Sequence, residues 1–213
     1  MNTTKGDFVE IKYVGRLDDG SIFDLNDAEV AKQEKIKAHI HDHTIICLGS
    51  KDVVQGLDDY LIGKEIGKKL TTSVSTEQGF GKRNAKLFKT FSLSKFKGQE
   101  FKPLPGIAIE VDGAQAVIKS VSGGRVLLDF NHPLAGKQLH YEVTITRKID
   151  SLKEKVSGIL ETNLHIHQPK VEEKDGTVTL EAQIPKEMQP VFETELKKRI
   201  PELKAFVIEN LRK

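Results

Sequence analysis

The chain has 213 residues, enough for one large domain or two to three small ones, and its 38% hydrophobic content favours folded cores over disorder. Its charged residues nearly cancel to a formal net charge of +2, which excludes a global attraction to polyanions such as nucleic acid. Because Cys47 is the single cysteine, and the chain has neither a basic-then-apolar leader nor an apolar run of membrane-spanning length, we expect a soluble, cytoplasmic protein without disulfides.

The first predicted element is a β-hairpin near the N-terminus. Apolar residues such as Val9, Ile11 and Tyr13 alternate with charged ones through residues 7–17, the pattern of a half-buried strand. The turn residues Asp18-Asp19-Gly20 follow, and Ile22-Phe23 begins the return strand.

A helix and two more strands are predicted after the hairpin. Residues 51–62 have helical apolar spacing, with Ser50 as a candidate N-cap and Gly63 as a candidate stop. Gly56 inside this helix costs about 1 kcal/mol relative to alanine, so we expect it to serve a close packing contact. Residues 70–76 and 139–145 again alternate. A short-stranded antiparallel sheet wrapped on one helix, an α+β lobe, is the predicted architecture.

The middle of the chain predicts an inserted, small β-domain over residues 84–129. Strands are expected at 87–94, 107–111, 114–121 and 125–129, with Asp112-Gly113 and Gly123-Gly124 as tight hairpin turns. Residues 83–130 carry 8 Lys+Arg against 4 Asp+Glu, so this piece alone is basic.

The tail, residues 151–213, predicts an αββα unit. A helix is expected near Leu152 to Leu160, strands at 164–169 and 178–184, and helical structure over 190–211 broken near Pro201. A unit this small buries little surface alone. Two alternatives follow: the tail forms a homodimer, or it docks on the first lobe of its own chain.

Several ordered motifs resemble one known family. They run through Ile11 to Gly15, Asp18 to Asp24, Leu48 to Leu57, Gly79-Phe80-Gly81, and finally Asn131 to Val143. In residue types and in their order along the chain, these motifs are similar to those of the FKBP-type peptidyl-prolyl cis/trans isomerases. They resemble in particular the SlyD-like and long archaeal members, which carry an inserted chaperone domain. The resemblance covers roughly residues 5–150, and the helix-containing segment 26–40 resembles the long archaeal members specifically.

The resemblance implies an isomerase domain over 1–83 and 130–150. Rotation about an X-Pro bond needs no nucleophile, metal or cofactor, only an apolar slot that binds the twisted amide better than the planar one. By resemblance the slot is lined by Tyr13, Phe23, Asp24, Ile46, Val53, Val54, Leu57, Phe80, Leu134 and Tyr141. The strand alternation independently turns Tyr13 and Tyr141 toward the covered face of the sheet, although the same pattern also suits two core aromatics.

Two positions depart from the family pattern. Leu57 stands where the vertebrate-type members have an indole at the floor of the slot, and this chain has no Trp. Phe80 stands where a tyrosine hydroxyl is usual. The first change puts tight macrolide binding in doubt more than it does isomerase activity, and the second removes one hydrogen bond to a substrate carbonyl.

Closely spaced histidines are a second candidate site. His39, His41 and His43 sit at period 2 and would share a strand face that could chelate a transition metal. We favour an exposed polar strand face as their explanation, because no cysteine or carboxylate completes a ligand set. His165 and His167 have the same two interpretations, so we assign no metal ligands.

The insert offers an apolar surface for other chains. Six large apolar residues lie among basic ones and leave room for an exposed patch: Phe88, Phe91, Leu93, Phe96, Phe101 and Leu104. The family resemblance implies that this patch is a chaperone surface, and the alternative is a purely structural insert. We therefore expect unfolded or nascent polypeptides with X-Pro bonds as partners, and neither membranes nor nucleic acid. Two rivals remain, a holdase with an inactive pocket and a ribosome- or RNA-associated factor. The tail has no GXXG loop or aromatic sheet motif, which disfavours the second.

Overall fold

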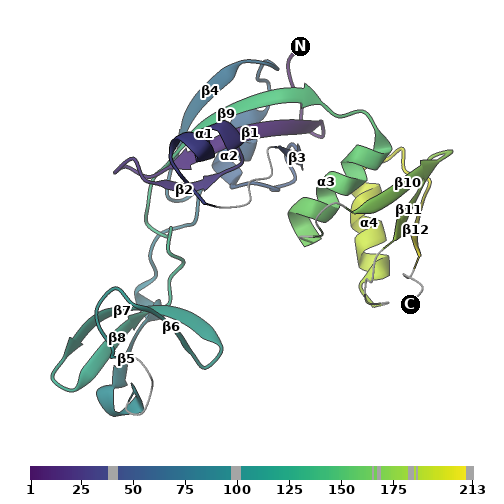
Figure 1. Cartoon of the computed structure of the whole chain (residues 1–213). Helices are drawn as coiled ribbons and strands as arrows, with labels where there is room; N and C mark the ends of the chain where they lie inside the picture. The colour runs from purple at the N-terminus through teal and green to yellow at the C-terminus, as the bar shows by residue number, and fades with distance from the viewer. Residues whose placement is uncertain are drawn as a thin grey trace. The chain divides into compact units, whose positions relative to one another are not determined.

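The computed structural model describes residues 1–37, 43–96, 102–164, 166, 169–181, 185 and 187–209. They form two compact units, one from Met1–Gln78 with Gln138–Lys213 and the other from Gly79–Lys137 (Figure 1). Within the described part of the chain, every helix is too short or too polar to cross a membrane.

The first unit is built on a five-stranded antiparallel sheet. Its strands are β1 (Phe8–Arg16), β2 (Ile22–Leu25), β3 (Thr44–Cys47), β4 (Lys69–Val74) and β9 (Leu139–Lys148). The order is β2-β1-β9-β4. On one edge of β1, the first half of the strand pairs with β3 and the second half pairs with β2. The predicted hairpin and both later strands are confirmed.

Two helices pack with this sheet, and one of them is shorter than predicted. Helix α1 (Ala28–Gln33) is capped by the Asp27 side chain, and α2 runs only over Gln55–Leu61, with Val54 instead of Ser50 at its N-cap. Residues 48–53 form turns instead, because the Asp58 carboxylate of α2 accepts hydrogen bonds from the Gly49 and Lys51 amides at 2.8 Å.

Gly56 has the close contact expected of it. A Cβ atom there would lie 2.6 Å from Val74 Cγ1 on β4, closer than any side chain tolerates. The missing side chain therefore sets how near α2 lies to the sheet.

The second unit is a four-stranded antiparallel sheet of order β5-β8-β7-β6. Its strands are β5 (Phe88–Ser92), β6 (Ala108–Val111), β7 (Ala114–Ser122) and β8 (Arg125–Asp129). Both predicted hairpin turns have positive φ at their two central residues, as tight turns between twisted strands require. The predicted strand 87–94 is shorter, because short 3₁₀ helices occupy Ala85–Leu87 and Leu93–Phe96.

The tail has a different order of elements from the predicted αββα. It contains α3 (Leu152–Leu164), β10 (Lys170–Lys174), β11 (Thr177–Glu181), α4 (Gln189–Arg199) and β12 (Ala205–Glu209). The strand predicted at 164–169 does not begin at Leu164, because α3 continues through that residue, and residues 165, 167 and 168 lie outside the described residues. The prediction of helix beyond Pro201 was wrong: β12 pairs in parallel with β11, and its alternating residues place Phe206 in the core while Val207 is 43% exposed.

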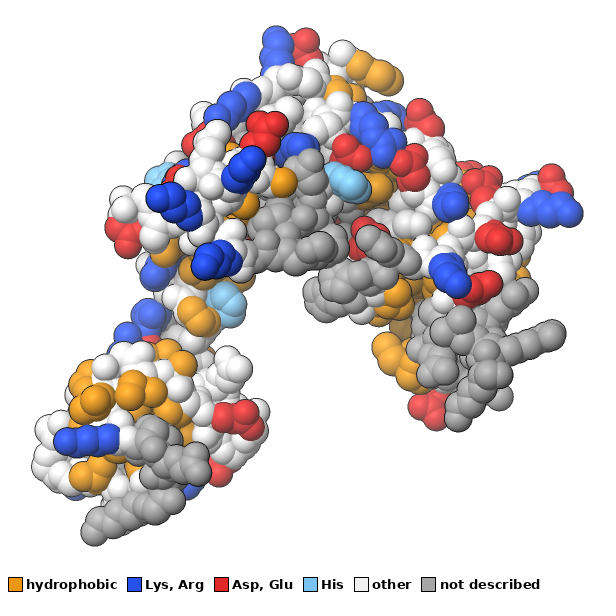
Figure 2. Space-filling model, viewed as in Figure 1, with side chains coloured by type: hydrophobic (Ala, Val, Ile, Leu, Met, Phe, Trp, Pro, Cys, Tyr) orange, Lys and Arg blue, Asp and Glu red, His pale blue; other side chains and the backbone are white. Residues whose placement is uncertain are grey.

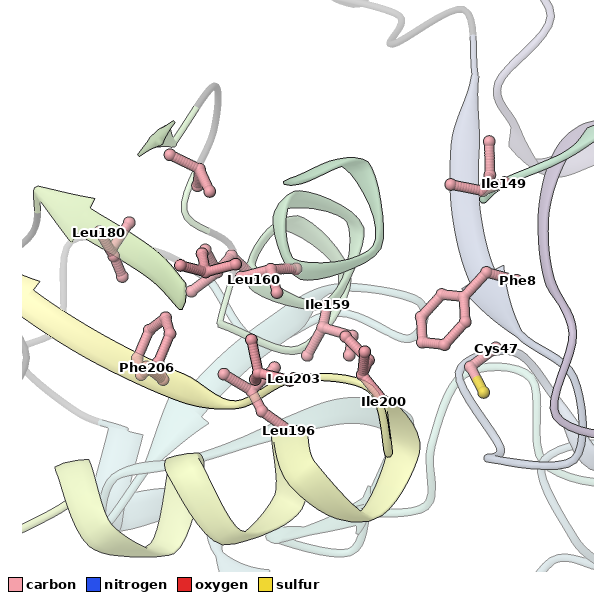
Figure 3. Close-up of a cluster of buried hydrophobic side chains, with 13 residues drawn as sticks. Phe8, Cys47, Ile149, Ile159, Leu160, Leu180, Leu196, Ile200, Leu203 and Phe206 are labelled. Atoms are coloured by element: carbon pink, nitrogen blue, oxygen red, sulfur yellow. The ribbon is translucent and has the colours of Figure 1, made fainter. Parts of the chain in front are cut away.

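The tail packs on the lobe within the first unit. Phe8, Cys47 and Ile149 share one buried apolar cluster with tail residues such as Ile159 and Ile200 (Figure 3). A Cβ at Gly158 of α3 would lie 2.6 Å from Ile45 Cβ on β3, and Thr162 Oγ1 donates to the Ile45 carbonyl at 3.2 Å. The tail therefore docks on the lobe of its own chain, which is one of the two alternatives that the sequence left open.

Candidate functional site

Three neighbouring strands bring the predicted pocket aromatics to one face of the sheet. In the strand register, Gly15 of β1 is opposite both Asp24 of β2 and Tyr141 of β9. The Tyr13 and Tyr141 ring centroids are 6.1 Å apart, and those of Phe23 and Tyr141 are 5.7 Å apart at 84°. The edge-to-face geometry is the one that aromatic quadrupoles favour.

Two residues absent from the predicted set make this arrangement possible. A Cβ at Gly15 would lie 2.6 Å from Phe23 Cζ, so the glycine leaves the space that the Phe23 ring fills. Asn26, only 4% exposed, accepts from the Tyr13 amide at 2.6 Å and donates to the Ile11 carbonyl at 2.8 Å and to Thr44 Oγ1 at 2.9 Å. An asparagine directly after a predicted strand was the available signal.

A hydrogen bond from Tyr13 Oη to Asp24 Oδ2, 2.9 Å long, supplies the polar part of the site. Burial, and secondly the Asp24 charge, raise the pKa of both Tyr13 and Tyr141 above the ordinary phenol value. Burial also raises the pKa of Asp24, although the hydrogen bond from Tyr13 acts in the opposite direction. Both phenols are therefore neutral at physiological pH, and the Tyr13 hydroxyl donates its proton to Asp24.

The remaining predicted pocket residues of the first unit lie on β3 and at the start of α2. Ile46 and Leu57 are each 1% exposed, whereas Val53 and Val54 are half-buried in the turn that leads into α2. Phe80 and Leu134 belong to the second unit. There the Phe80 ring stacks on His132 at 4.4 Å, and the Leu134 amide donates to His132 Nδ1 at 3.2 Å.

A separate cavity of about 310 Å³ lies on the outer face of the sheet and shares only Tyr141 with the predicted set. It includes Ser73 and His140, whose Oγ and Nδ1 atoms are 2.9 Å apart, and His140 Nε2 is 2.7 Å from Asp18 Oδ1. This Ser-His-Asp row lacks the water-excluded surroundings of a nucleophilic triad, because the Asp18 side chain is 72% exposed. It anchors the β1–β2 turn to β9.

The predicted chaperone surface of the second unit divides into core and surface residues. Phe96 was assigned to the surface wrongly, since it is 4% exposed in the apolar cluster of this unit, and Phe91 and Leu93 pack against that cluster while half-buried. Phe88 is half-buried, and Leu104 is 49% exposed. Phe101 lies outside the described residues.

A groove of about 400 Å³ with both apolar and polar side chains in its lining lies on this same unit. Phe91 and Phe130, whose rings are 6.3 Å apart, line it together with Leu87 and Val111. Lys89 Nζ lies 5.4 Å from the Phe130 ring centroid. Figure 2 shows hydrophobic side chains gathered on the visible face of this unit. Leu87 and Phe130 were missing from the predicted surface because they lie at the edges of the predicted strands.

The histidine site finds no support in the part of the chain that is described. No group of three or more His, Cys, Asp or Glu residues there could hold a metal ion. His43 is described and immediately precedes β3, whereas His39, His41, His165 and His167 fall outside the described residues.

Comparison with known proteins gives one consistent result. Residues 1–96 match the family model "FKBP-type peptidyl-prolyl cis-trans isomerase", and residues 91–134 match "FKBP26, IF domain". A short-type peptidyl-prolyl cis-trans isomerase of Methanocaldococcus jannaschii is 33% identical over 66% of this chain and 90% of its own length. The FKBP-type 16 kDa peptidyl-prolyl cis-trans isomerase of Escherichia coli is 30% identical over a match that covers 46% of this chain and 68% of the relative. The FKBP-type peptidyl-prolyl cis-trans isomerase SlyD of Treponema pallidum is 26% identical over a match that covers 71% of this chain and 81% of the relative.

Proposed function

Because the chain belongs to the FKBP-type peptidyl-prolyl cis-trans isomerases, we propose that it turns X-Pro bonds at the face formed by Tyr13, Phe23, Asp24 and Tyr141. We further propose that the groove of the second unit, lined by Leu87, Phe91, Val111 and Phe130, captures unfolded polypeptide for this reaction. The observation that carries the first proposal is the convergence of three aromatic rings and a Tyr-Asp hydrogen bond on one face.

The chemistry of this face suits amide rotation. The barrier to rotation is about 18–20 kcal/mol because amide resonance must be broken, and a twisted amide has less resonance and a more localised carbonyl. Apolar rings favour that less polar state over the planar one, and the neutral Tyr141 phenol can donate to a displaced carbonyl without taking part in proton transfer. Asp24 orients Tyr13 through their 2.9 Å hydrogen bond and does not act as a base.

The groove supports the capture step. The apolar part of its lining, with Lys89 and Lys95 over the Phe130 and Phe91 rings, offers contacts to apolar segments of any sequence. A chain held there is present at the isomerase face at a high effective concentration, so long substrates gain more than short peptides.

The isomerase face is tested by tyrosine substitution. Tyr13→Ala or Tyr141→Ala should lower kcat/KM for a short X-Pro peptide at least tenfold, about 1.4 kcal/mol of transition-state stabilisation. Tyr60→Ala is the matched control, because Tyr60 is the remaining tyrosine and its hydroxyl donates to the Thr71 carbonyl instead. Undiminished catalysis in both folded pocket variants would remove the site assignment.

The capture step is tested by comparing two substrates. Replacing residues 84–128 by a short loop should leave peptide activity mostly intact and sharply reduce catalysis of proline-limited refolding of an unfolded protein. Leu87→Ser with Leu104→Ser should act in the same direction, because these side chains are 37% and 49% exposed; Val191→Ser on the tail, 71% exposed, is the control. Equal losses on both substrates indicate a structural insert, and capture without catalysis indicates the holdase alternative.

A further inference from the structure

A buried ion pair joins the tail to the turn that precedes α2. Arg199, at the end of α4, places Nη1 2.6 Å from Asp52 Oδ1, and the two side chains are only 12% and 3% exposed. The second carboxylate oxygen of Asp52 accepts from the Cys47 amide at 2.8 Å, and Arg199 Nε donates to Glu195 at 2.9 Å. Both carboxylate oxygens of Asp52 therefore accept a hydrogen bond, one from Arg199 and one from the Cys47 amide.

The pair is coupled to the conformation of one short segment. Residues 48–53 are turns and bends, and the α2 N-cap, Val54, makes no side-chain capping bond. Two carboxylates hold this segment: Asp58, through the Gly49 and Lys51 amides, and Asp52, through Cys47 and Arg199. Asp52 immediately precedes Val53 and Val54, two residues of the slot that the family resemblance implies.

The charges of the pair depend on each other. Burial alone would lower the pKa of Arg199, but Asp52 and then Glu195 hold it above its ordinary value. A carboxylate as buried as Asp52 is costly to leave without a partner, so without Arg199 it would turn toward water. Because Asp52 is adjacent to Val53 in the chain, this movement would displace the two valines.

We infer that Arg199 is a positioning residue for the isomerase face: from the C-terminal tail it holds Asp52, and through Asp52 it sets the positions of Val53 and Val54. This inference rests on the proposed function, together with the assignment of Val53 and Val54 to the substrate slot that the family resemblance implies. It also gives the tail a role in catalysis that does not require the tail to contact substrate.

Docking of the tail does not depend on this pair alone. Phe8, Cys47 and Ile149 are each at most 3% exposed in the shared apolar cluster, and Gly158 lies against Ile45. Removing the Arg199 charge therefore leaves the larger apolar contact in place, so positioning and docking are separable in an experiment.

The experiment uses the full chain with Arg199→Met, Arg199→Lys and the control Lys198→Met, an exposed neighbour that lines the same small cavity. We expect Arg199→Met to lower kcat/KM for an X-Pro peptide three- to tenfold, with the methyl NMR signals of Val53 and Val54 shifted. Arg199→Lys should restore most of the activity, and Lys198→Met should match the wild type. Adding Asp52→Asn to Arg199→Met should recover part of the loss, because it removes the unpaired charge.

Hydrogen exchange over residues 152–164 shows whether the tail remains docked. Retained α3 protection together with reduced activity supports positioning. Full activity with unchanged valine signals overturns the inference, and so does a loss of activity accompanied by loss of α3 protection, which would mean simple undocking. None of these outcomes resembles failure of the site assignment itself, which would leave the Tyr13 and Tyr141 variants fully active.

Discussion

Single polar side chains hold the proposed isomerase face in place. Asn26 is 4% exposed and ties the Tyr13 amide, the Ile11 carbonyl and Thr44 together by three hydrogen bonds, so it links β1 to the start of β3. Tyr13 in turn is hydrogen-bonded to Asp24. The face is therefore held by a short series of hydrogen bonds that begins at the buried Asn26.

Asn26→Ala tests that series. It leaves the part-buried Tyr13 amide and the buried Ile11 carbonyl group without the Asn26 partner, and an unsatisfied buried group costs about 1–3 kcal/mol. We expect a lower Tm by thermal denaturation and a lower kcat/KM for X-Pro peptides. Asn163→Ala, at an exposed position of α3, is the control. An unchanged Tm in Asn26→Ala would show that water replaces the amide side chain.

Asp129 of the second unit gives a pH prediction. Burial alone would raise its pKa, but hydrogen bonds from Asn131 and the Arg83 guanidinium together hold it below the ordinary value. A depressed carboxyl pKa contributes stability that is present above the ordinary value of about 3.9 and is lost as the pH falls through the folded-state pKa.

We therefore expect Asp129→Asn to destabilise the second unit at pH 7, and the difference from the wild type to shrink as the pH falls below about 4. Hydrogen exchange of peptides within residues 85–130 is the measurement, because all three tyrosines lie in the first unit and do not report on this one. A difference that is independent of pH would contradict the assigned role of the carboxylate.

At the scale of elements, two glycines determine how closely helices lie on the sheet. Gly56 brings α2 against Val74, and Gly158 brings α3 against Ile45. Both are in helices, where glycine is about 1 kcal/mol less favourable than alanine, so their cost is offset by the packing that follows.

Gly158→Ala reverses the usual effect of that substitution. In a solvent-exposed helix it would stabilise, but here the new Cβ would lie 2.6 Å from Ile45 Cβ and Cγ2, so the tail must move away from β3. We expect a lower Tm and faster hydrogen exchange in α3, whereas Lys153→Ala at an exposed α3 position should be neutral. Stabilisation by Gly158→Ala would argue that the tail does not pack on the lobe in solution.

At the scale of the whole molecule, the tail has both a docked face and an open one. Docking covers the apolar residues around Val156, Ile159 and Ile200, part of the surface that led to the homodimer prediction. An apolar groove of about 530 Å³ remains at the α3 and α4 ends, where Met188 is 51% and Val191 71% exposed. The homodimer through residues 151–213 thus stays a prediction.

Light scattering of the full chain at tens of micromolar tests it, with truncation at Asp150 as the comparison. We expect a dimer for the full chain and an active monomer for the truncated one, with peptide activity reduced by about the same factor as in Arg199→Met. A monomeric full chain would reject the pairing. The truncated lobe should also be less stable, because Phe8, Cys47 and Ile149 become exposed.

The sequence by itself predicted the hairpin and the two later strands of the five-stranded sheet, the strands of the second unit and its two glycine turns, because these depend on local periodicity and on residues that only certain turns accept. It missed the late start of α2, because Asp58 diverts the preceding amides into turns. It also missed β12, whose pairing partner, β11, is more than twenty residues earlier. Only the tertiary structure showed that Gly15 and Asn26 support the aromatic face, that Phe96 is core, and that Arg199 reaches Asp52 across 147 positions of sequence. Contacts between distant segments decide these features, and no local pattern encodes them.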